Sequence, residues 1–382
     1  MELYQASKQW AERPNDERFW TLEEMKAVCE NYKKSAVESN VKSENLRVEV
    51  VDEDIRLTGK SDVLARLTHW SFGQLSRLVK APADYLRNLP ATLSVQNLNH
   101  GLKKLGSKDL NLMFHQNGSL ILRSALTDRY ERIWNTDVVN RIIPFQESGW
   151  RTPPAKPVRN NQPGTRIATE QDVIKSATAD IGIKAGDTIA PAGLYASDHD
   201  MFAFLVDDSH PIDSGSGKPM FRGFFVWNSE VGASSLGIST FLYDSVCGNH
   251  IVWGASNVKE IRLKHIGEID MRYRTKFTLE LKKYSESSVG EIETMIVKAR
   301  KKEIAKTKDE VLDLLFGKHI TSRKNLELGY ELAEQHQKVN GNPNTVWGMV
   351  SGLTRLSQET NYADERNNLD RCASKVLQTI EF

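Results

Sequence analysis

The sequence predicts an α+β protein in which an antiparallel sheet is flanked by helices and followed by a helical C-terminal region. Short apolar runs, rich in β-branched and aromatic residues and bounded by turn residues, occur at 201–206, 220–227 and 236–243. The segments before and after them carry apolar residues at helical spacing. With 39% hydrophobic and 26% charged residues among 382, the chain has the composition of a globular protein. We find no apolar run of about 18 residues and therefore expect no membrane-spanning helix.

Residues 1–150 are expected to form an N-terminal region that contains both helices and strands. A capping box made by Thr21 and Glu24 predicts the start of a first helix. The pair Asn117–Gly118 lies between two apolar runs, which is a strong signal for a β-hairpin. Another hairpin and three further helices are expected between these points, at 46–57, 72–79, 82–89 and 91–105.

The rest of the chain divides by composition into three parts. Residues 151–165 hold four of the twelve prolines and are expected to be a linker or an extended surface arm. Residues 166–320 should form the central antiparallel sheet, with a loop at 207–219, followed by a long basic helix from about 289 to 317. Residues 321–382 should be helical.

Positive charge is concentrated in one segment of the chain. The net charge is only +1, but residues 258–308 contain 14 basic and 8 acidic residues, which gives +6. Aromatic residues are interspersed among these cations, and single-stranded nucleic acid needs cations for its phosphates and rings for its bases. The alternative is a packed sheet whose aromatics are core, followed by a solvated lysine-rich helix. The candidate nucleic-acid-binding residues are Arg222, Trp227, Tyr243, Trp253, Arg262, Lys264, His265, Arg272, Arg274 and Lys276.

Spacing groups four of these cations into one possible phosphate track. Arg262 and Lys264 are two residues apart and share a face of the expected strand 260–266. Arg272 and Lys276 are four apart and share a face if this segment is helical. We expect a basic groove if the strand and the helix meet at these faces.

Two other sets of residues have the residue types of a catalytic or metal-binding site. Aspartates and histidines between 198 and 213 have the residue types of a Mg²⁺ or Mn²⁺ site, but Asp is also common in turns, which is the favoured interpretation. Cys247 and His250 have the residue types of a nucleophile and its base, but a tight bend in a strand explains this stretch better. We find no phosphate-binding GxxxxGK[ST] loop and therefore expect no ATP. Because the acidic set is interpreted as turns, we also expect no metal or other cofactor. The acidic set is Asp198, His199, Asp200, Asp207, Asp208, His210 and Asp213.

Residues 221–255, 262–269 and 67–90 resemble the phage- and plasmid-encoded family classed as domain of unknown function 932, the phage/plasmid-like proteins. The resemblance implies a gene of a mobile element expressed in a bacterial cytoplasm, and it implies no particular reaction. The three widely spaced cysteines agree with that compartment. The motif residues that carry the resemblance are Cys247, Asn249, Arg262, Lys264 and His265.

These observations favour a DNA-metabolism protein that binds single-stranded DNA and promotes strand annealing in recombination without ATP. The order of elements, a sheet followed by a long helix, is similar to the core of single-strand annealing proteins, which act as oligomers. An apolar stripe along the long helix is a second reason to expect a homo-oligomer. The alternative is a counter-defence protein that binds a host immune protein, and a metal-dependent nuclease ranks third.

Overall fold

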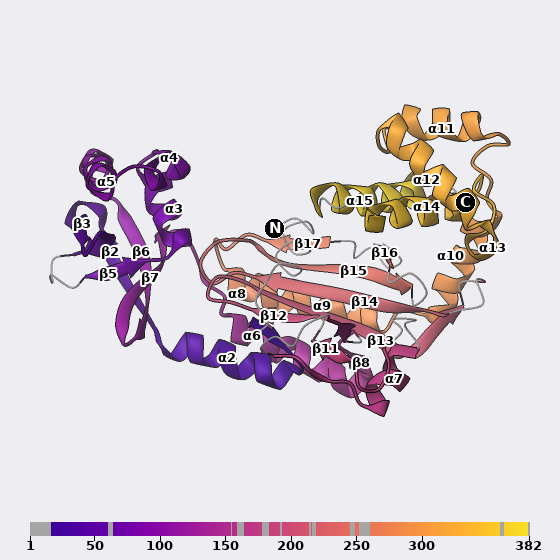
Figure 1. Ribbon diagram of the computed structural model, residues 1–382, viewed down its shortest axis with the longest axis horizontal. Coiled ribbons are helices and arrows are strands. Elements are labelled where there is room, and N and C mark those ends of the chain that lie inside the picture. The colour runs from indigo at the N-terminus through magenta and orange to yellow at the C-terminus, as the bar shows by residue number, and fades with distance from the viewer. Residues whose placement is uncertain are drawn as a thin grey trace.

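A computed structural model confirms the α+β class, with antiparallel sheets, flanking helices and a helical C-terminal region (Figure 1). Among the described residues, no helix is both long and apolar enough to cross a membrane. The structure describes residues 17–59, 64–153, 155–158, 164–177, 183–191, 193–213, 215, 219–244, 249–251, 260–359 and 363–380.

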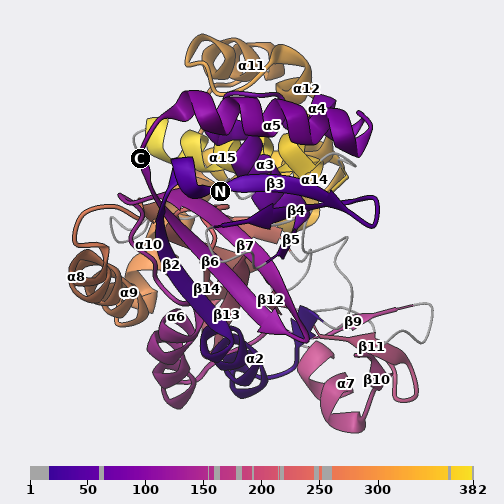
Figure 2. The same cartoon turned by 90° about the vertical axis from the view of Figure 1, so that its left-hand side faces the viewer.

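The N-terminal sheet has six strands in the order β2-β6-β7-β5-β4-β3, and only the β5–β7 pair is parallel. Three helices lie together on one side of it (Figure 2), where the apolar residues of sheet and helices form one core. Asp52 and Glu53 both have positive φ, 51° and 64°, as a type I′ hairpin turn requires. The elements are β2 Ala36–Lys42, β3 Arg47–Val51, β4 Asp54–Thr58, β5 Ala65–Leu67, α3 His69–Leu78, α4 Ala83–Arg87, α5 Ala91–Leu105, β6 Asp109–Asn117 and β7 Ser119–Thr127.

The central sheet is antiparallel throughout, and its main path runs β1-β12-β13-β14-β15-β16. β17 pairs with β15, and β8 pairs with β13. The expected loop at 207–219 is wrong in its first half, because β13 continues to Asp213 and bulges between Asp207 and Ile212. The strands are β1 Arg18–Phe19, β8 Trp150–Arg151, β12 Leu194–Ala196, β13 Met201–Asp213, β14 Pro219–Asn228, β15 Leu236–Asp244, β16 Asn249–Ile251 and β17 Glu260–Leu263.

The two faces of the central sheet have different cores. One face packs against helices through aliphatic and aromatic side chains. The other carries an aromatic cluster that includes Phe225, Trp227 and Phe241, all at most 2% exposed. The helical side consists of α2 Leu22–Lys34, α6 Asn135–Ile142, α8 Ile269–Arg272, the π-helical turn Tyr273–Phe277 and α9 Thr278–Ser285.

A small third sheet, β10-β11-β9, involves the predicted linker. Its described part is not a simple spacer, because Arg151 belongs to β8 and Lys156 to β9. The elements of this sheet and its helix are β9 Lys156–Pro157, β10 Arg166–Ile167, α7 Glu170–Ala177 and β11 Thr188–Ala190.

The C-terminal region is a helical bundle with its own core. The single long helix expected at 289–317 is wrong: Thr307 and Glu310 form a capping box that starts a new helix. The apolar stripe expected to mediate self-association is buried in this core, for example Ile296 and Val311, both 0% exposed. The helices are α10 Val289–Lys301, α11 Lys308–Gly317, α12 Arg323–Gln335, α13 Gln337–Asn340, α14 Val346–Glu359 and α15 Ala363–Thr379.

The loop that follows β14 joins the N-terminal sheet to the central sheet. The carbonyl of Val231 accepts hydrogen bonds from the Trp70 indole at 3.0 Å and from the Gln74 amide at 2.7 Å. Beside it, the fully buried carboxylate of Glu230 lies 3.3 Å from the Arg123 guanidinium of β7. These bonds fix α3 against the central sheet, so the position of Trp70 is set by both parts of the protein.

Candidate functional site

Arg222 and Trp227 are buried, which contradicts their predicted role as surface contacts. Arg222 is 3% exposed, and its guanidinium lies 2.7 Å from the Asp207 carboxylate on the neighbouring strand. It also donates to the carbonyl of Ser287 at 2.6 Å, two residues after the end of α9. Trp227 is 2% exposed in the aromatic cluster. Both side chains hold the fold together.

His265 and Arg272 are likewise used inside the protein. His265 is 4% exposed, and its ring stacks on Tyr130 with the centroids 4.9 Å apart. Burial lowers the pKa of His265 to about 4, so the ring is neutral at pH 7. The Arg272 guanidinium donates to the carbonyls of Lys264, at 3.0 Å, and of Ile266. The buried, neutral His265 ring is not available to bind a phosphate, and the half-buried Arg272 uses one of its guanidinium nitrogens for the protein's own carbonyls.

Arg262 and Lys264 are exposed, but the predicted groove between strand and helix does not form. Ile261 and Leu263 of β17 face the helices and pack into the aliphatic core. Arg262 points to the opposite face, where its guanidinium lies 5.9 Å from the Trp227 ring centroid. The space between β17 and the helix is therefore filled by apolar side chains, and the four cations do not share one track.

Two of the remaining predicted residues are on the surface, and two lie outside the description. Arg274 is 2.8 Å from the Asp270 carboxylate one helical turn earlier, and Lys276 is exposed on the same helix. The Tyr243 side chain and the whole of Trp253 lie outside the described residues. The Cys247 of the considered nucleophile pair also lies outside them.

The acidic cluster separates into a turn and a strand. Ser197 and Asp200 close the β12–β13 turn, with the hydroxyl 2.9 Å from the carboxylate. Asp207 lies farther along, in β13. Among the described residues, no three His, Cys, Asp or Glu side chains are arranged to hold a metal ion.

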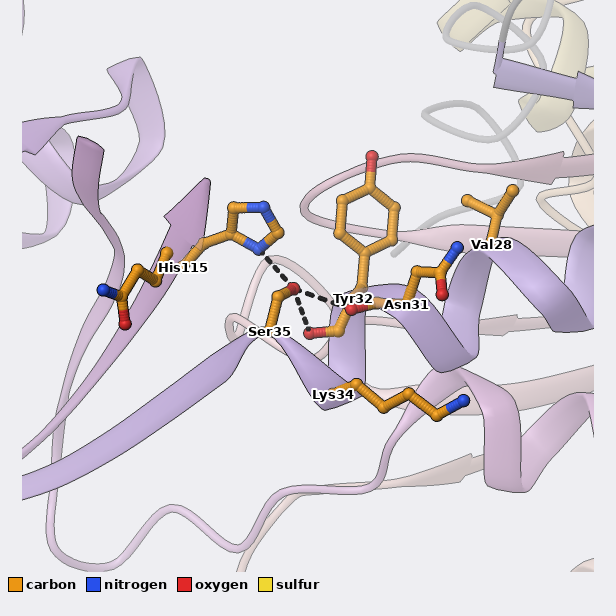
Figure 3. A pocket seen from close by; sticks show the side chains of 7 residues that line it. Val28, Asn31, Tyr32, Lys34, Ser35 and His115 are labelled. Atoms are coloured by element: carbon orange, nitrogen blue, oxygen red, sulfur yellow. Dashed lines mark hydrogen bonds between the residues drawn. The ribbon is translucent and has the colours of Figure 1, made fainter. Parts of the chain in front are cut away.

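A pocket of about 500 Å³ lies where the end of α2 meets β6 (Figure 3). The Ser35 hydroxyl is 2.8 Å from Nδ1 of His115 and 2.7 Å from the carbonyl of Asn31. Burial lowers the pKa of His115, and the Arg123 charge lowers it further. A serine–histidine pair resembles a nucleophile and its base, but Ser35 caps the C-terminus of α2. The negative end of the helix dipole would oppose an alkoxide there, so this contact is a structural cap.

A larger pocket of about 730 Å³ lies between α3 and α4, and we call it the α3–α4 pocket. Arg77 and Lys80 line it with exposed side chains, and within the described chain no carboxylate forms an ion pair with either. The half-buried Trp70 forms part of the wall, with the Arg77 guanidinium 5.8 Å from its ring centroid. Arg87 and Asp84 also line the pocket, 2.7 Å apart. The charged lining therefore consists of three cations and one carboxylate, which gives the pocket a net charge of +2.

The backbone at Lys80 is unusual. Its φ is 60°, in the left-handed region that normally favours glycine at the end of a helix. The amide of Ala81 donates to the carbonyl of Ser76 at 2.9 Å, which is the bond of a Schellman motif with Lys80 at its left-handed position. A lysine here costs about 1–2 kcal/mol in backbone strain relative to a right-handed conformation. His319 ends α11 with the same motif, so the conformation sets the position of Lys80 but does not by itself mark a site.

Sequence reasoning did not select this pocket as a site. Its residues lie in the stretch 67–90, which stands out in the sequence only through its family resemblance. The available signal was local charge: residues 70–87 contain three cations, one tryptophan and a single acidic residue. This local excess is hidden by the balanced charge of the N-terminal region.

Comparisons of the chain with protein-family models, with curated proteins and with solved structures found no match. Membership of the phage/plasmid-like family therefore stays a prediction. The geometry of the α3–α4 pocket is the basis for an inference about function.

Proposed function

We propose that this protein binds single-stranded nucleic acid, with single-stranded DNA as its substrate, through the α3–α4 pocket. The observation that carries the proposal is one pocket that holds Arg77 and Lys80, which have no carboxylate partner among the described residues, together with the half-buried ring of Trp70, 5.8 Å from the Arg77 guanidinium. Phosphates need the cations, and an unstacked base needs the ring. Bases of a duplex are already stacked and paired, so the ring favours a single strand.

This proposal keeps the function expected from the sequence and assigns it to a different site, whose shape depends on Arg87. Arg87 contributes mainly to the shape of the pocket, because it donates to the carbonyl of His69 at 2.9 Å and pairs with Asp84. It thereby ties the start of α3 to α4. The wider role, a phage or plasmid DNA-metabolism factor that anneals strands as an oligomer in the bacterial cytoplasm, belongs to the same proposal and rests on the sequence resemblance.

Fluorescence anisotropy with labelled single-stranded and duplex oligonucleotides, across a salt series, tests the proposal. We expect tighter binding of the single strand, because stacking on an exposed base contributes about 1–3 kcal/mol. Equal affinity for both forms, or no binding of either, would overturn it. The second result would favour the alternative in which a host defence protein is the partner.

A further inference from the structure

Asp207 and His210 form a carboxylate–imidazole pair in the bulged part of β13. Nδ1 of His210 is 3.0 Å and 3.1 Å from the two carboxylate oxygens of Asp207. The same carboxylate accepts from the Ser209 hydroxyl at 2.7 Å and from the Arg222 guanidinium at 2.7 Å. Burial opposes ionisation, but these bonds outweigh it and hold the pKa of Asp207 below its usual value. A carboxylate only accepts hydrogen bonds, so the hydrogen of neutral His210 lies on Nδ1 and the lone pair on Nε2.

The backbone around this pair is shaped to bring its side chains together. The β13–β14 register shifts between Asp207 and Ile212, and such bulges re-aim side chains at sheet edges and beside active sites. Gly149 has a φ of 89°, and a Cβ atom on it would lie only 2.6 Å from the Ser209 hydroxyl. The position therefore needs glycine both for its conformation and for the room it leaves to Ser209.

A cavity of about 320 Å³ opens beside the pair. Its walls include Phe145 and Trp150, with the sheet residues Asp207 and His210, so one side is apolar and the other polar. Asp207 is 1% exposed, whereas the His210 side chain is 58% exposed and accessible from the cavity. The imidazole is thus the exposed member of the pair, and the carboxylate is the buried one.

The charges around the cavity select the kind of ligand. Each carboxylate here has a cationic partner: Glu286 lies 3.7 Å from Lys282, and Asp207 lies 2.7 Å from Arg222. A phosphate ester would therefore meet no net positive charge from these groups. An uncharged substrate with a flat or apolar group needs no such charge and would contact Phe145.

We propose that His210 is the general base of a hydrolytic site for small uncharged carboxylic esters. Nε2 of His210 takes a proton from water as its oxygen bonds to the ester carbon. The Lys282 ammonium, which lies 3.7 Å from Glu286 at rest, balances the negative charge on the carbonyl oxygen. The bond from carbon to the leaving oxygen then breaks, and His210 returns the proton to that oxygen. The products are a carboxylic acid and an alcohol, and no co-reactant besides water is needed. Asp207 is a positioning residue that fixes the ring.

Hydrolysis of 4-nitrophenyl acetate, followed by release of nitrophenolate, tests this site. We expect His210→Gln to lower kcat/KM by about 100-fold, which is at the low end of general-base effects. His100→Gln removes another exposed histidine, from α5, and is the matched control that should behave as the wild type. A His210→Gln rate equal to that of the wild type, or an equal loss in the control, would overturn the proposal.

The positioning role of Asp207 has its own readout. We expect Asp207→Asn to lower kcat while KM stays unchanged, because the ring is misaligned but the ester still binds. Ser209→Ala keeps the carboxylate but removes a hydroxyl that lies 2.7 Å from it and 3.0 Å from Nδ1 of His210, so it tests the positioning of the ring if the first variant does not fold. A rise in KM with unchanged kcat in the folded variant would show that Asp207 only shapes the cavity.

Discussion

The basic segment at 258–308 and the α3–α4 pocket contain the same kinds of side chain but use them differently. In and beside the segment, cations bind groups of the protein itself: Arg272 binds backbone carbonyls, and Arg274 binds a carboxylate. In the pocket, Arg77 and Lys80 face solvent with no carboxylate partner among the described residues. A count of charges does not distinguish these cases, because a cation already paired in the fold has little left to offer a phosphate. Replacing a paired cation should therefore change stability, and replacing a free one should change binding.

The largest effect should come from Arg222, the buried cation of β14. Arg222→Met leaves the Asp207 carboxylate buried without its guanidinium partner, which should lower the free energy of unfolding by about 3–5 kcal/mol. Urea unfolding followed by circular dichroism measures this. Arg262→Met is the control, because an exposed cation over a ring contributes only about 0.5–1 kcal/mol. Equal losses in the two variants would contradict the account.

His265 should make stability depend on pH. Its pKa is about 4 in the folded protein against 6.5 ordinarily, so the unfolded chain binds the extra proton first. Stability should therefore fall as the pH drops from 6.5 to 4, by up to about 3 kcal/mol. His265→Gln should lose less over the same range, as measured by urea unfolding at pH 7 and pH 4. The same pH dependence in the variant would show that groups other than His265 cause the loss of stability.

The Trp70 ring should contribute mainly to the binding of ligands that carry bases. Trp70→Leu removes the ring and should weaken binding of single-stranded DNA by about 1–3 kcal/mol per stacked base. Binding of polyphosphate, which has no bases, should weaken much less. Anisotropy competition with the two ligands measures the difference, and an equal loss for both would mean that the variant has disturbed the pocket instead.

A substitution at Lys80 should change the stability of the fold and the affinity for DNA in opposite directions. Lys80→Gly relieves the left-handed backbone and should raise the free energy of unfolding by about 0.5–1 kcal/mol while weakening DNA binding. Lys104→Gly, in the last turn of α5, should instead lower stability by about 0.5–1 kcal/mol and leave binding unchanged. A Lys80→Gly protein that binds as tightly as the wild type would remove this lysine from the site.

Local signals predicted much of the fold. The capping box at Thr21 and the Asn117–Gly118 hairpin both correspond to observed boundaries. The break between α10 and α11 has a local signal of the same kind, the capping box of Thr307 and Glu310. The apolar residues on both sides of it continue at helical spacing, which led to the expectation of one unbroken helix. Asp207 was expected in a loop because Asp, Ser and Pro residues follow it closely, whereas its partner on β14 keeps it in a strand.

The candidate sites depended on contacts that no local pattern contains. Arg222 is buried because the register pairs it directly with Asp207, and that register follows from the whole β13–β14 hairpin. Arg262 faces away from the helix because β17 buries its two apolar residues on the other side. The α3–α4 pocket needs the left-handed turn at Lys80, a conformation that a sequence reader would assign to glycine.

The most direct test compares two double variants that each remove one arginine and one lysine. The first, Arg77→Ala with Lys80→Ala, removes two cations from the α3–α4 pocket. The second, Arg262→Ala with Lys264→Ala, removes the two exposed cations at β17. Anisotropy with a single-stranded oligonucleotide across a salt series should show a lower affinity and a salt slope reduced by about 1.4 for the first variant, at about 0.7 per lost phosphate contact. The second variant should retain the affinity and slope of the wild type. The reverse pattern, with both folds intact by circular dichroism, would contradict the account and return the binding site to the basic segment.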